Sequence, residues 1–217
     1  IYAQDRINLN IDKNNFLKTH SALCSLEKNS FTNKRNTRAV IYIVRDPRNV
    51  ITSVSNHFSK SIEKSFDFIS NKNKMLTSDE WGGQNFGITS VLGSWAGHYN
   101  SWKNIKFAPI LIIKYEDLLI DTQKTFIKVL NFLATITEIK IEYKKVSNVV
   151  DSCNFDKLVK LEEKDGFEES AANLSNQKKI NFFYLGEKNN WKKLLNSNIE
   201  KKITTLFNFE MKELGYL

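Results

Sequence analysis

Residues Ala39–Phe58, AVIYIVRDPRNVITSVSNHF, decide the fold. The opening run, Ala39–Val44, is apolar without a break and rich in β-branched side chains, which predicts a strand buried on both faces. Arg45 ends this strand abruptly. Pro47 suits the first turn of the helix that follows, with Asp46 available as its cap. A buried strand that leads directly into a helix is the unit from which parallel sheets are built.

Two further strands are predicted, one before this unit in the sequence and one after it. Asn15–His20 (NFLKTH) is short and ends in polar residues, whereas Pro109–Lys114 (PILIIK) repeats the buried pattern. Tyr115 stops the second of these strands, and Asp121 or Thr122 then caps another helix. Strands that alternate with helices predict an α/β fold, in which a parallel β-sheet is flanked by helices.

Elsewhere the pattern is weaker. The polar, irregular stretch Lys60–Gly87 predicts a long loop, whereas Ile88–Ile105 has helical apolar spacing. Two or three shorter helices are expected up to Asp165, and the chain becomes irregular again near Phe182–Trp191. A last helix is expected to present one apolar side, formed by Ile199, Ile203, Leu206, Phe207 and Leu214.

Polar residues follow all three predicted strands. Lys18-Thr19-His20 ends the first strand, Arg45-Asp46 the second, and Tyr115-Glu116 the third. In parallel sheets, ligands bind beyond the carboxyl ends of the strands. We therefore expect the three clusters to converge on one crevice.

The composition is that of a folded protein. The chain has 217 residues, 41% of them hydrophobic and 26% charged, which fits a single domain over residues 1–217. The net charge of +8 favours anionic partners such as nucleotides, acidic glycans or nucleic acid, but selects none of them.

No apolar run reaches about 18 residues, so no transmembrane segment is expected. Cys24 and Cys153 show neither CxxC nor metal-ligand spacing, which predicts reduced thiols in a cytoplasmic protein.

Arg45 and the helix start behind it form the strongest candidate site. An arginine offers a planar fork of donors, and a helix N-terminus adds free N–H groups and a favourable dipole. Ser53, two turns into the helix, adds a hydroxyl to the same region. This arrangement predicts an anion site. The chemistry alone leaves one alternative open, an Arg45–Asp46 ion pair with Ser53 bonded to its own helix.

The stretch Ile41–Phe58 resembles a segment of the sulfotransferases that use PAPS (3′-phosphoadenosine 5′-phosphosulfate) as their sulfuryl donor. In that family a strand-end arginine and a serine eight residues later bind the 3′-phosphate of the donor. Arg45 and Ser53 match this spacing. The resemblance implies a P-loop-type α/β fold, PAPS as co-substrate with PAP as product, and no metal.

An upstream segment, Phe16–His20 (FLKTH), is similar to the K-T-H signature of the same family. The resemblance implies that His20 is the general base, because imidazole titrates near neutrality and accepts a proton from an acceptor hydroxyl. It also implies that Lys18 stabilises negative charge on the transferring group. Outside this context, a lone histidine at a strand end is more often a surface or packed residue.

Two downstream segments extend the resemblance. Gly93-Ser94-Trp95 and Leu111–Leu118 (LIIKYEDL) are similar to a stretch in which the tyrosine of Y-E-D contacts the adenine ring. Tyr115 stands at that position, and its aromatic ring with a polar tip suits a base.

The family's closing loop, R-K-G followed by G-D-W, is matched only in part by FFYLGEKNNWKK. Gly186 aligns, and the resemblance implies that it lets the loop approach the nucleotide. Tyr184 and Leu185 stand where the basic pair belongs, and two asparagines replace Gly-Asp. Our hypothesis is that Lys188 or Lys192 supplies the missing positive charge.

The phosphate-binding turn that precedes K-T-H in the family has no counterpart. Nothing in Ile1–Asn15 resembles it, and no G-x-x-x-x-G-K-[ST] occurs in the chain. Backbone N–H groups of such a turn cradle the 5′-phosphosulfate. We therefore expect the sulfotransferase-like domain to be N-terminally incomplete.

These features predict a sulfotransferase that moves a sulfuryl group from PAPS to a hydroxyl or amine of a small-molecule or glycan acceptor. The identity of the acceptor and the oligomeric state stay open. The alternative is a non-catalytic protein or fragment that binds PAP or another anion. A kinase-like enzyme would need a Walker lysine and Mg²⁺ ligands, which are not visible. No nucleic-acid partner is expected, because aromatic residues are not set among basic ones.

Overall fold

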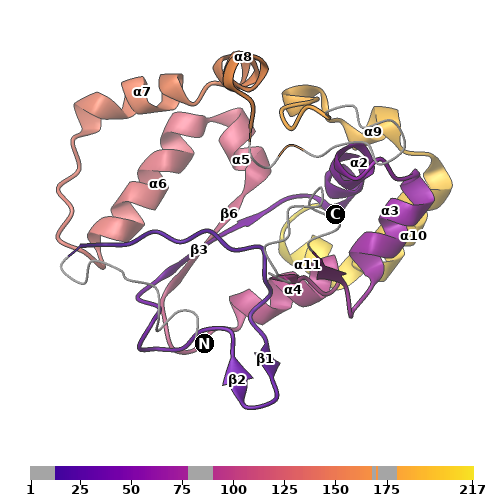
Figure 1. The fold of residues 1–217 in the computed structure, drawn as a ribbon, viewed down its shortest axis with the longest axis horizontal. Helices are drawn as coiled ribbons and strands as arrows, with labels where there is room; N and C mark the ends of the chain where they lie inside the picture. Colours follow the sequence, from indigo (N-terminus) through magenta and orange to yellow (C-terminus); the bar gives the residue numbers. More distant parts are fainter. Residues whose placement is uncertain (1–12, 78–89, 168–169, 171–179) are drawn as a thin grey trace.

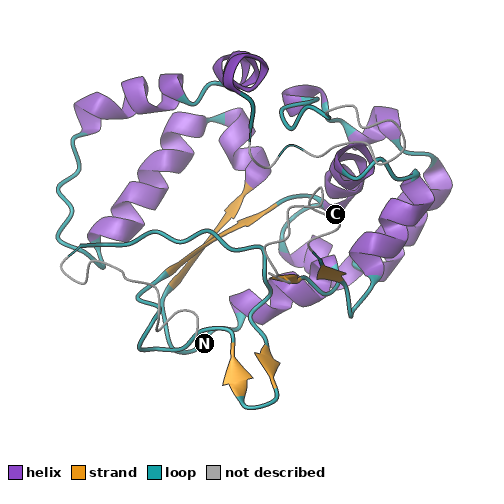
Figure 2. Ribbon diagram, viewed as in Figure 1, coloured by secondary structure: helices purple, strands orange, loops and turns teal. Residues whose placement is uncertain are grey.

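Two parallel strands lie at the centre of the molecule. The computed structural model describes residues 13–77, 90–167, 170 and 180–217. Within them, β3 (Val40–Val44) pairs with β6 (Ile110–Lys114) in a register that runs from Val40–Ile110 to Val44–Lys114. Two short antiparallel pairs lie apart from this ribbon (Figure 2), namely β1 (Ser25–Leu26) with β2 (Asn29–Ser30) and β4 (Met75–Leu76) with β5 (Ser90–Val91).

Helices lie on both sides of the central strands (Figure 1). On one side are α5 (Tyr115–Ile120), α6 (Thr122–Ala134), α7 (Tyr143–Ser152) and α8 (Phe155–Asp165). On the other side are α2 (Pro47–His57), α3 (Ile62–Ser70), α4 (Trp95–Lys103), the 3₁₀ turn η2 (Gly186–Lys188), α9 (Trp191–Leu194), α10 (Ser197–Leu206) and α11 (Asn208–Glu213). The expected α/β fold, parallel strands flanked by helices, is confirmed.

The step from β3 into α2 has the predicted local chemistry. Asp46 is the N-cap of α2, and its side chain accepts the Arg48 N–H at 2.9 Å. Pro47 is the first helical residue, where its missing N–H leaves no hydrogen bond unmade. The same rule places Asp121 at the start of α6, where it accepts the Lys124 N–H at 2.8 Å. Both caps were expected from the sequence.

The main apolar core lies between α2, α3, α10 and α11. Its buried side chains are Ile51, Ile69, Ile199, Ile203, Phe207 and Met211. Trp95 of α4 joins them, with its ring centroid 5.2 Å from that of Phe207. Burying one such side chain completely contributes about 1.5–3 kcal/mol. This core fixes α2, and therefore the residues at its N-terminus, against α3 and α10.

Two predictions about strands are wrong. Asn15–His20 forms no strand, and it is exposed throughout. The chain is held just beyond it, where the Ala22 N–H donates to the Val91 carbonyl at 2.7 Å. Strand β3 is not buried on both faces, since 57% of Ile43 is exposed. Ile43 borders an open groove, which is described with the site below.

Lys60–Gly87 is not a long loop, although residues 78–89 lie outside the described part. Ser61 caps α3 by accepting the Lys64 N–H at 3.3 Å, and Ile69 is buried against the core. Ile62, Phe66 and Ile69 have the spacing of a helix and face the core, so the polar residues elsewhere in this stretch concealed a short amphipathic helix.

The helix expected over Ile88–Ile105 begins only at Trp95, and residues 88–89 lie outside the described part. Gly93 has φ of +64°, a left-handed conformation that breaks the backbone before the helix. Ser94 then caps α4 by accepting the Gly97 N–H at 3.1 Å. The helical spacing of apolar residues in the sequence therefore continued across the short strand β5 and the turn at Gly93, which are not helical.

The expected last helix is two helices. Phe207, between α10 and α11, has φ of −109° and ψ of 22°, so the helix axis changes there. Ile203 and Phe207 are buried, but 50% of Leu206 is exposed, which contradicts its predicted place on the apolar side. Across the described residues, no helix is long and apolar enough to cross a membrane.

Candidate functional site

Arg45 and Tyr115 meet at the carboxyl ends of the two central strands. Val44 pairs with Lys114, so each site residue is the next one after a paired position. The guanidinium carbon of Arg45 lies 4.4 Å from the centroid of the Tyr115 ring. A cation over an aromatic face at this distance is attracted to the ring. Two of the three polar clusters therefore converge as predicted.

The Arg45 side chain is half-buried, and its guanidinium has unused hydrogen-bonding capacity. Its Nη1 donates to the Ser53 hydroxyl at 3.3 Å, and its Nε is buried without a hydrogen-bond partner in the described residues. Burial lowers the pKa of Arg45, and the nearby Tyr115 and Glu116 partly oppose this effect. A buried N–H without an acceptor costs free energy, which an anion at this position would recover.

Asp46 pairs with Arg48 and not with Arg45. Its carboxylate accepts from Arg48 Nε at 3.0 Å and from Arg48 Nη2 at 2.7 Å, and both side chains are buried. The guanidinium of Arg48 also lies over the ring of Trp191, 3.9 Å from its centroid. The alternative of an Arg45–Asp46 ion pair is therefore wrong.

Ser53 lies on α2 and faces Asn189, at the end of η2. Its hydroxyl receives hydrogen bonds from Arg45 and from Asn189 Nδ2, the latter at 2.9 Å. It also donates to the Asn49 carbonyl at the long distance of 3.3 Å. The predicted neighbourhood of Arg45 and Ser53 is confirmed, and the bond of Ser53 back to its own helix is present as well.

Gly186 begins the turn η2 in a conformation that favours glycine. Its φ is +52°, and a Cβ built on it would lie 2.7 Å from the ring of Phe155. Lys188 and Lys192 are exposed on either side of Asn189. Trp191 donates its backbone N–H to Asn49 Oδ1 at 3.0 Å, so this segment is fastened to α2.

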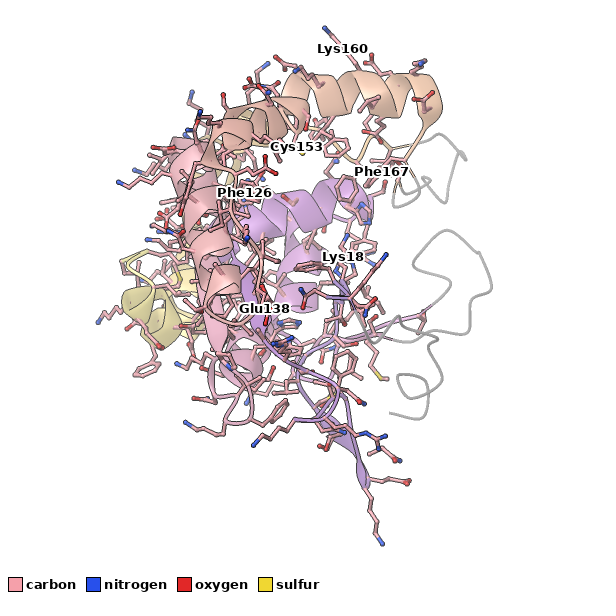
Figure 3. The ribbon with its side chains drawn as sticks, turned by 90° about the vertical axis from the view of Figure 1, so that its left-hand side faces the viewer. Lys18, Phe126, Glu138, Cys153, Lys160 and Phe167 are labelled. Atoms are coloured by element: carbon pink, nitrogen blue, oxygen red, sulfur yellow. The ribbon has the colours of Figure 1, made fainter. Side chains whose placement is uncertain are left out.

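The residues before Gly186 are held from α8. Glu162 is buried, and its carboxylate accepts the backbone N–H groups of Phe182 at 2.7 Å and Phe183 at 2.9 Å. Phe167, at the end of α8 (Figure 3), packs with both rings at centroid distances of 4.8 and 5.2 Å. The segment that aligns with the closing loop is therefore supported from two sides, by α2 and by α8.

His20 is tied to the centre of the molecule through His98. The Nε2 of His98 lies 3.2 Å from the backbone carbonyl oxygen of His20, which only accepts, so Nε2 carries the proton. Nδ1 then accepts from the Tyr42 hydroxyl at 2.9 Å. Burial lowers the pKa of His98, which keeps the ring neutral at pH 7. Lys18 is exposed on the extended segment before His20.

An open groove of about 300 Å³ runs along this face. Its polar lining includes Arg45, Tyr42 and His98, and most of its other walls are apolar. The apolar lining residues are Ile43, Val44, Val50, Val54, Phe68, Ile69, Leu92 and Trp95. Because His98 both lines the groove and binds the His20 backbone, the groove connects the Arg45 region with the third cluster.

The C-terminal residues close the base of the site. Glu116 accepts the Asp46 N–H at 3.0 Å and the Tyr216 hydroxyl at 2.8 Å, using one carboxylate oxygen for each. Arg48 donates to the Tyr216 carbonyl at 2.8 Å. Burial, followed by the charge of Glu116, raises the pKa of Tyr216 well above its usual range. The phenol therefore stays protonated and remains a donor.

Tyr216→Phe is expected to lower the free energy of unfolding by about 1.5–3 kcal/mol, the usual value of a hydrogen bond to a charged group. Urea titration followed by circular dichroism measures the change. Tyr184→Phe is the matched control, because 58% of Tyr184 is exposed and its hydroxyl has no partner in the described residues. Equal stability of both variants would contradict this role for Tyr216.

Three residues of the site were not predicted from the sequence. His98 lies one turn after Trp95 on α4, where no motif marks it. Asn189 replaces the glycine of the family's G-D-W pattern, and this difference indicated a changed role for the position. Tyr216 gave no signal, since its contacts depend on the return of the chain from α11.

The chemistry of the site fits a nucleotide phosphate. The cation Arg45 has an unpaired buried N–H, Ser53 adds a hydroxyl, and Tyr115 adds an aromatic ring. In the described part of the chain, no three His, Cys, Asp or Glu side chains are grouped to hold a metal ion.

Solved structures with this fold are sulfotransferase-like proteins. Mouse sulfotransferase SULT7A1 complexed with PAP matches with a TM-score of 0.56 and 23% identity, over 82% of this chain and 59% of that one. Retinol dehydratase with androsterone and the inactive cofactor PAP matches with a TM-score of 0.62 and 17% identity, over 94% and 55%. The same enzyme with retinol and PAP gives 0.60 and 17%, over 94% and 55%. The chain thus spans less than two thirds of these proteins.

No curated protein matches the sequence. The family model described as the sulfotransferase domain matches residues 5–215, which is nearly the whole chain. The chain therefore belongs to the sulfotransferase domain family.

Proposed function

We propose that the protein transfers a sulfuryl group from PAPS to a hydroxyl or amine of a small acceptor. The observation that carries the proposal is the half-buried Arg45 guanidinium, whose buried Nε has no partner in the described residues and whose Nη1 lies beside the Ser53 hydroxyl. Among the known donors of a sulfuryl group, PAPS presents a 3′-phosphate that these two residues would hold. The PAP in the related structures supports this choice of donor.

The other assignments rest on the resemblance to the sulfotransferase motifs. Tyr115 holds the adenine with its hydroxyl or its second face, because Arg45 covers one face of the ring. Gly186 lets the closing segment approach the nucleotide. His20 accepts the acceptor proton, and Lys18 stabilises charge at the transferring group. PAPS, when bound, supplies the activated sulfuryl group, and the chain supplies positioning and charge stabilisation.

We assign the acceptor to the groove between Arg45 and His98. Its mainly apolar walls favour a small molecule with an apolar body over a glycan, which would need many hydrogen-bonding groups. Related structures hold androsterone and retinol, and both observations point to alcohols of this kind. Cys24 and Cys153 are free thiols, which supports a reducing compartment such as the cytoplasm.

The deciding experiment measures PAP binding and sulfuryl transfer in the same preparation. Binding is measured by calorimetry, and transfer by incubating labelled PAPS with a panel of apolar alcohols, phenols and amines. Binding with turnover of at least one acceptor supports the proposal. Binding without turnover of any acceptor supports the non-catalytic alternative instead. Absence of binding overturns both.

Lys188→Ala and Lys192→Ala are each expected to weaken PAP binding about two- to fivefold, because exposed charge pairs contribute up to about 1 kcal/mol. The loss should shrink at high salt, which screens exposed charges. Lys193→Ala is the matched control, since this lysine is also exposed on α9. If the double variant of Lys188 and Lys192 binds PAP normally, neither lysine replaces the missing basic pair.

A further inference from the structure

Asn189 stands where the family pattern has glycine, and its side chain points into the site. The residue is buried, with 8% of its surface exposed, and its φ of −71° needs no glycine. It ends the turn η2, where its N–H donates to the Gly186 carbonyl at 3.2 Å. A buried amide in place of a hydrogen atom adds two donors and one acceptor to this region.

The orientation of this amide is fixed by its neighbours. The Asn49 carbonyl oxygen only accepts, so the atom of Asn189 that lies 3.1 Å from it is the nitrogen Nδ2. The second hydrogen of Nδ2 points to the Ser53 hydroxyl, 2.9 Å away. The oxygen Oδ1 in turn accepts from the Thr52 hydroxyl at 2.5 Å. All the hydrogen-bonding atoms of the amide are therefore engaged within α2.

This arrangement leaves the Ser53 proton without a good acceptor. The hydroxyl oxygen already accepts from Asn189 and from Arg45. Its proton has only the Asn49 carbonyl, at 3.3 Å, and that oxygen already accepts from Asn189 Nδ2 at 3.1 Å. Ser53 is consequently free to turn its proton to an anion without leaving the Asn49 carbonyl unpaired.

We propose that Asn189 is a positioning residue that aims the Ser53 hydroxyl at the 3′-phosphate of the donor. This inference rests on the proposed function, since it requires that Arg45 and Ser53 hold that phosphate. Asn189 acts through Ser53 and replaces part of the grip that the absent basic pair provides elsewhere in the family. It also sets the chain apart from relatives with glycine here, in which no side chain reaches the serine from this position.

The test is a double-mutant cycle on nucleotide affinity. Adenosine 3′,5′-bisphosphate and adenosine 5′-monophosphate are titrated by calorimetry into the unsubstituted chain, Ser53→Ala, Asn189→Ala and the double variant. Asn189→Ala is expected to weaken bisphosphate binding about tenfold, the usual effect of losing a hydrogen bond to a charged group. Affinity for the monophosphate should change less than about twofold. The double variant should bind like Ser53→Ala alone, because residues that act through one another are not additive.

Asn190→Ala is the matched control, because this exposed neighbour caps α9 and has no contact with Ser53. Melting temperatures are recorded for all variants. If Asn189→Ala fails to fold, Asn189→Asp keeps the shape but accepts from Ser53 instead of donating to it, and should lose bisphosphate affinity at least as strongly.

Four outcomes separate the hypotheses. Equal weakening of both nucleotides by Asn189→Ala, or additive losses in the double variant, would overturn the positioning role. An unsubstituted chain that does not distinguish the two nucleotides, or whose binding survives Arg45→Ala, would overturn the proposed function itself.

Discussion

Arg45→Ala is expected to weaken binding of adenosine 3′,5′-bisphosphate about 100-fold. A guanidinium that faces a phosphate makes charge-assisted hydrogen bonds worth about 1.5–3 kcal/mol each, and burial protects them from screening. The folded chain should lose little stability, because Arg45 makes one long hydrogen bond and its Nε has no partner among the described residues. Calorimetric titration of the nucleotide measures the effect.

Two companion variants make this result specific. Arg45→Lys keeps the charge but loses the planar fork of donors, so its affinity for the nucleotide should fall between that of the unsubstituted chain and that of Arg45→Ala. Arg38→Ala removes an exposed arginine just before β3 and should leave the affinity unchanged. Retention of full affinity in a folded Arg45→Ala protein would show that the nucleotide binds elsewhere.

His20→Ala is expected to lower kcat for sulfuryl transfer by about 10²–10⁴-fold, the usual contribution of a positioned general base. Affinity for adenosine 3′,5′-bisphosphate should remain, since in the proposed assignment His20 acts on the acceptor whereas Arg45 and Ser53 hold the 3′-phosphate. The residual rate should lose its dependence on pH between about 5 and 8, where imidazole titrates. Initial rates with labelled PAPS and a turned-over acceptor measure both effects.

His57→Ala serves as the control for the loss of a histidine. His57 ends α2 and its ring lies edge-on to Phe182, 5.9 Å between centroids, on the side of the closing segment. Its removal should change stability more than kcat. A His20→Ala enzyme with an unchanged rate and pH profile would remove His20 from the mechanism.

The central strands and the N-caps of α2 and α6 were predictable because their signals are local. The apolar run Val40–Val44, rich in β-branched residues, has few alternatives to a strand, and a proline after an aspartate marks a helix start. The meeting of Arg45 with Tyr115 was also predictable, since parallel strands end at one edge of a sheet. These features depend either on residues adjacent in the sequence or on the rule that parallel strands end at the same edge of a sheet.

The remaining features were not predictable because their causes are distant in the chain. Helix α3 packs against α2 and α10 through Ile62, Phe66 and Ile69, but its nine residues are too few to stand out beside the polar stretch that follows them. Asn189 was visible only as a departure from a family pattern, and its partner Ser53 lies 136 positions away. Glu116 and Tyr216 are 100 positions apart, so their hydrogen bond exists only in the folded chain.

The pairing of β3 with β6 has a consequence for how the protein folds. The strands are joined by contacts across 70 residues, and contacts of such long range form slowly. A slip of one residue between them would turn every side chain to the opposite face and separate Arg45 from the Tyr115 ring. Only the correct alignment creates the proposed phosphate site, and a ligand that binds only that alignment stabilises it by mass action. If the proposed site binds the nucleotide, the nucleotide is expected to favour the correct pairing of β3 with β6, and to raise the yield of refolding as well as the stability of the folded chain.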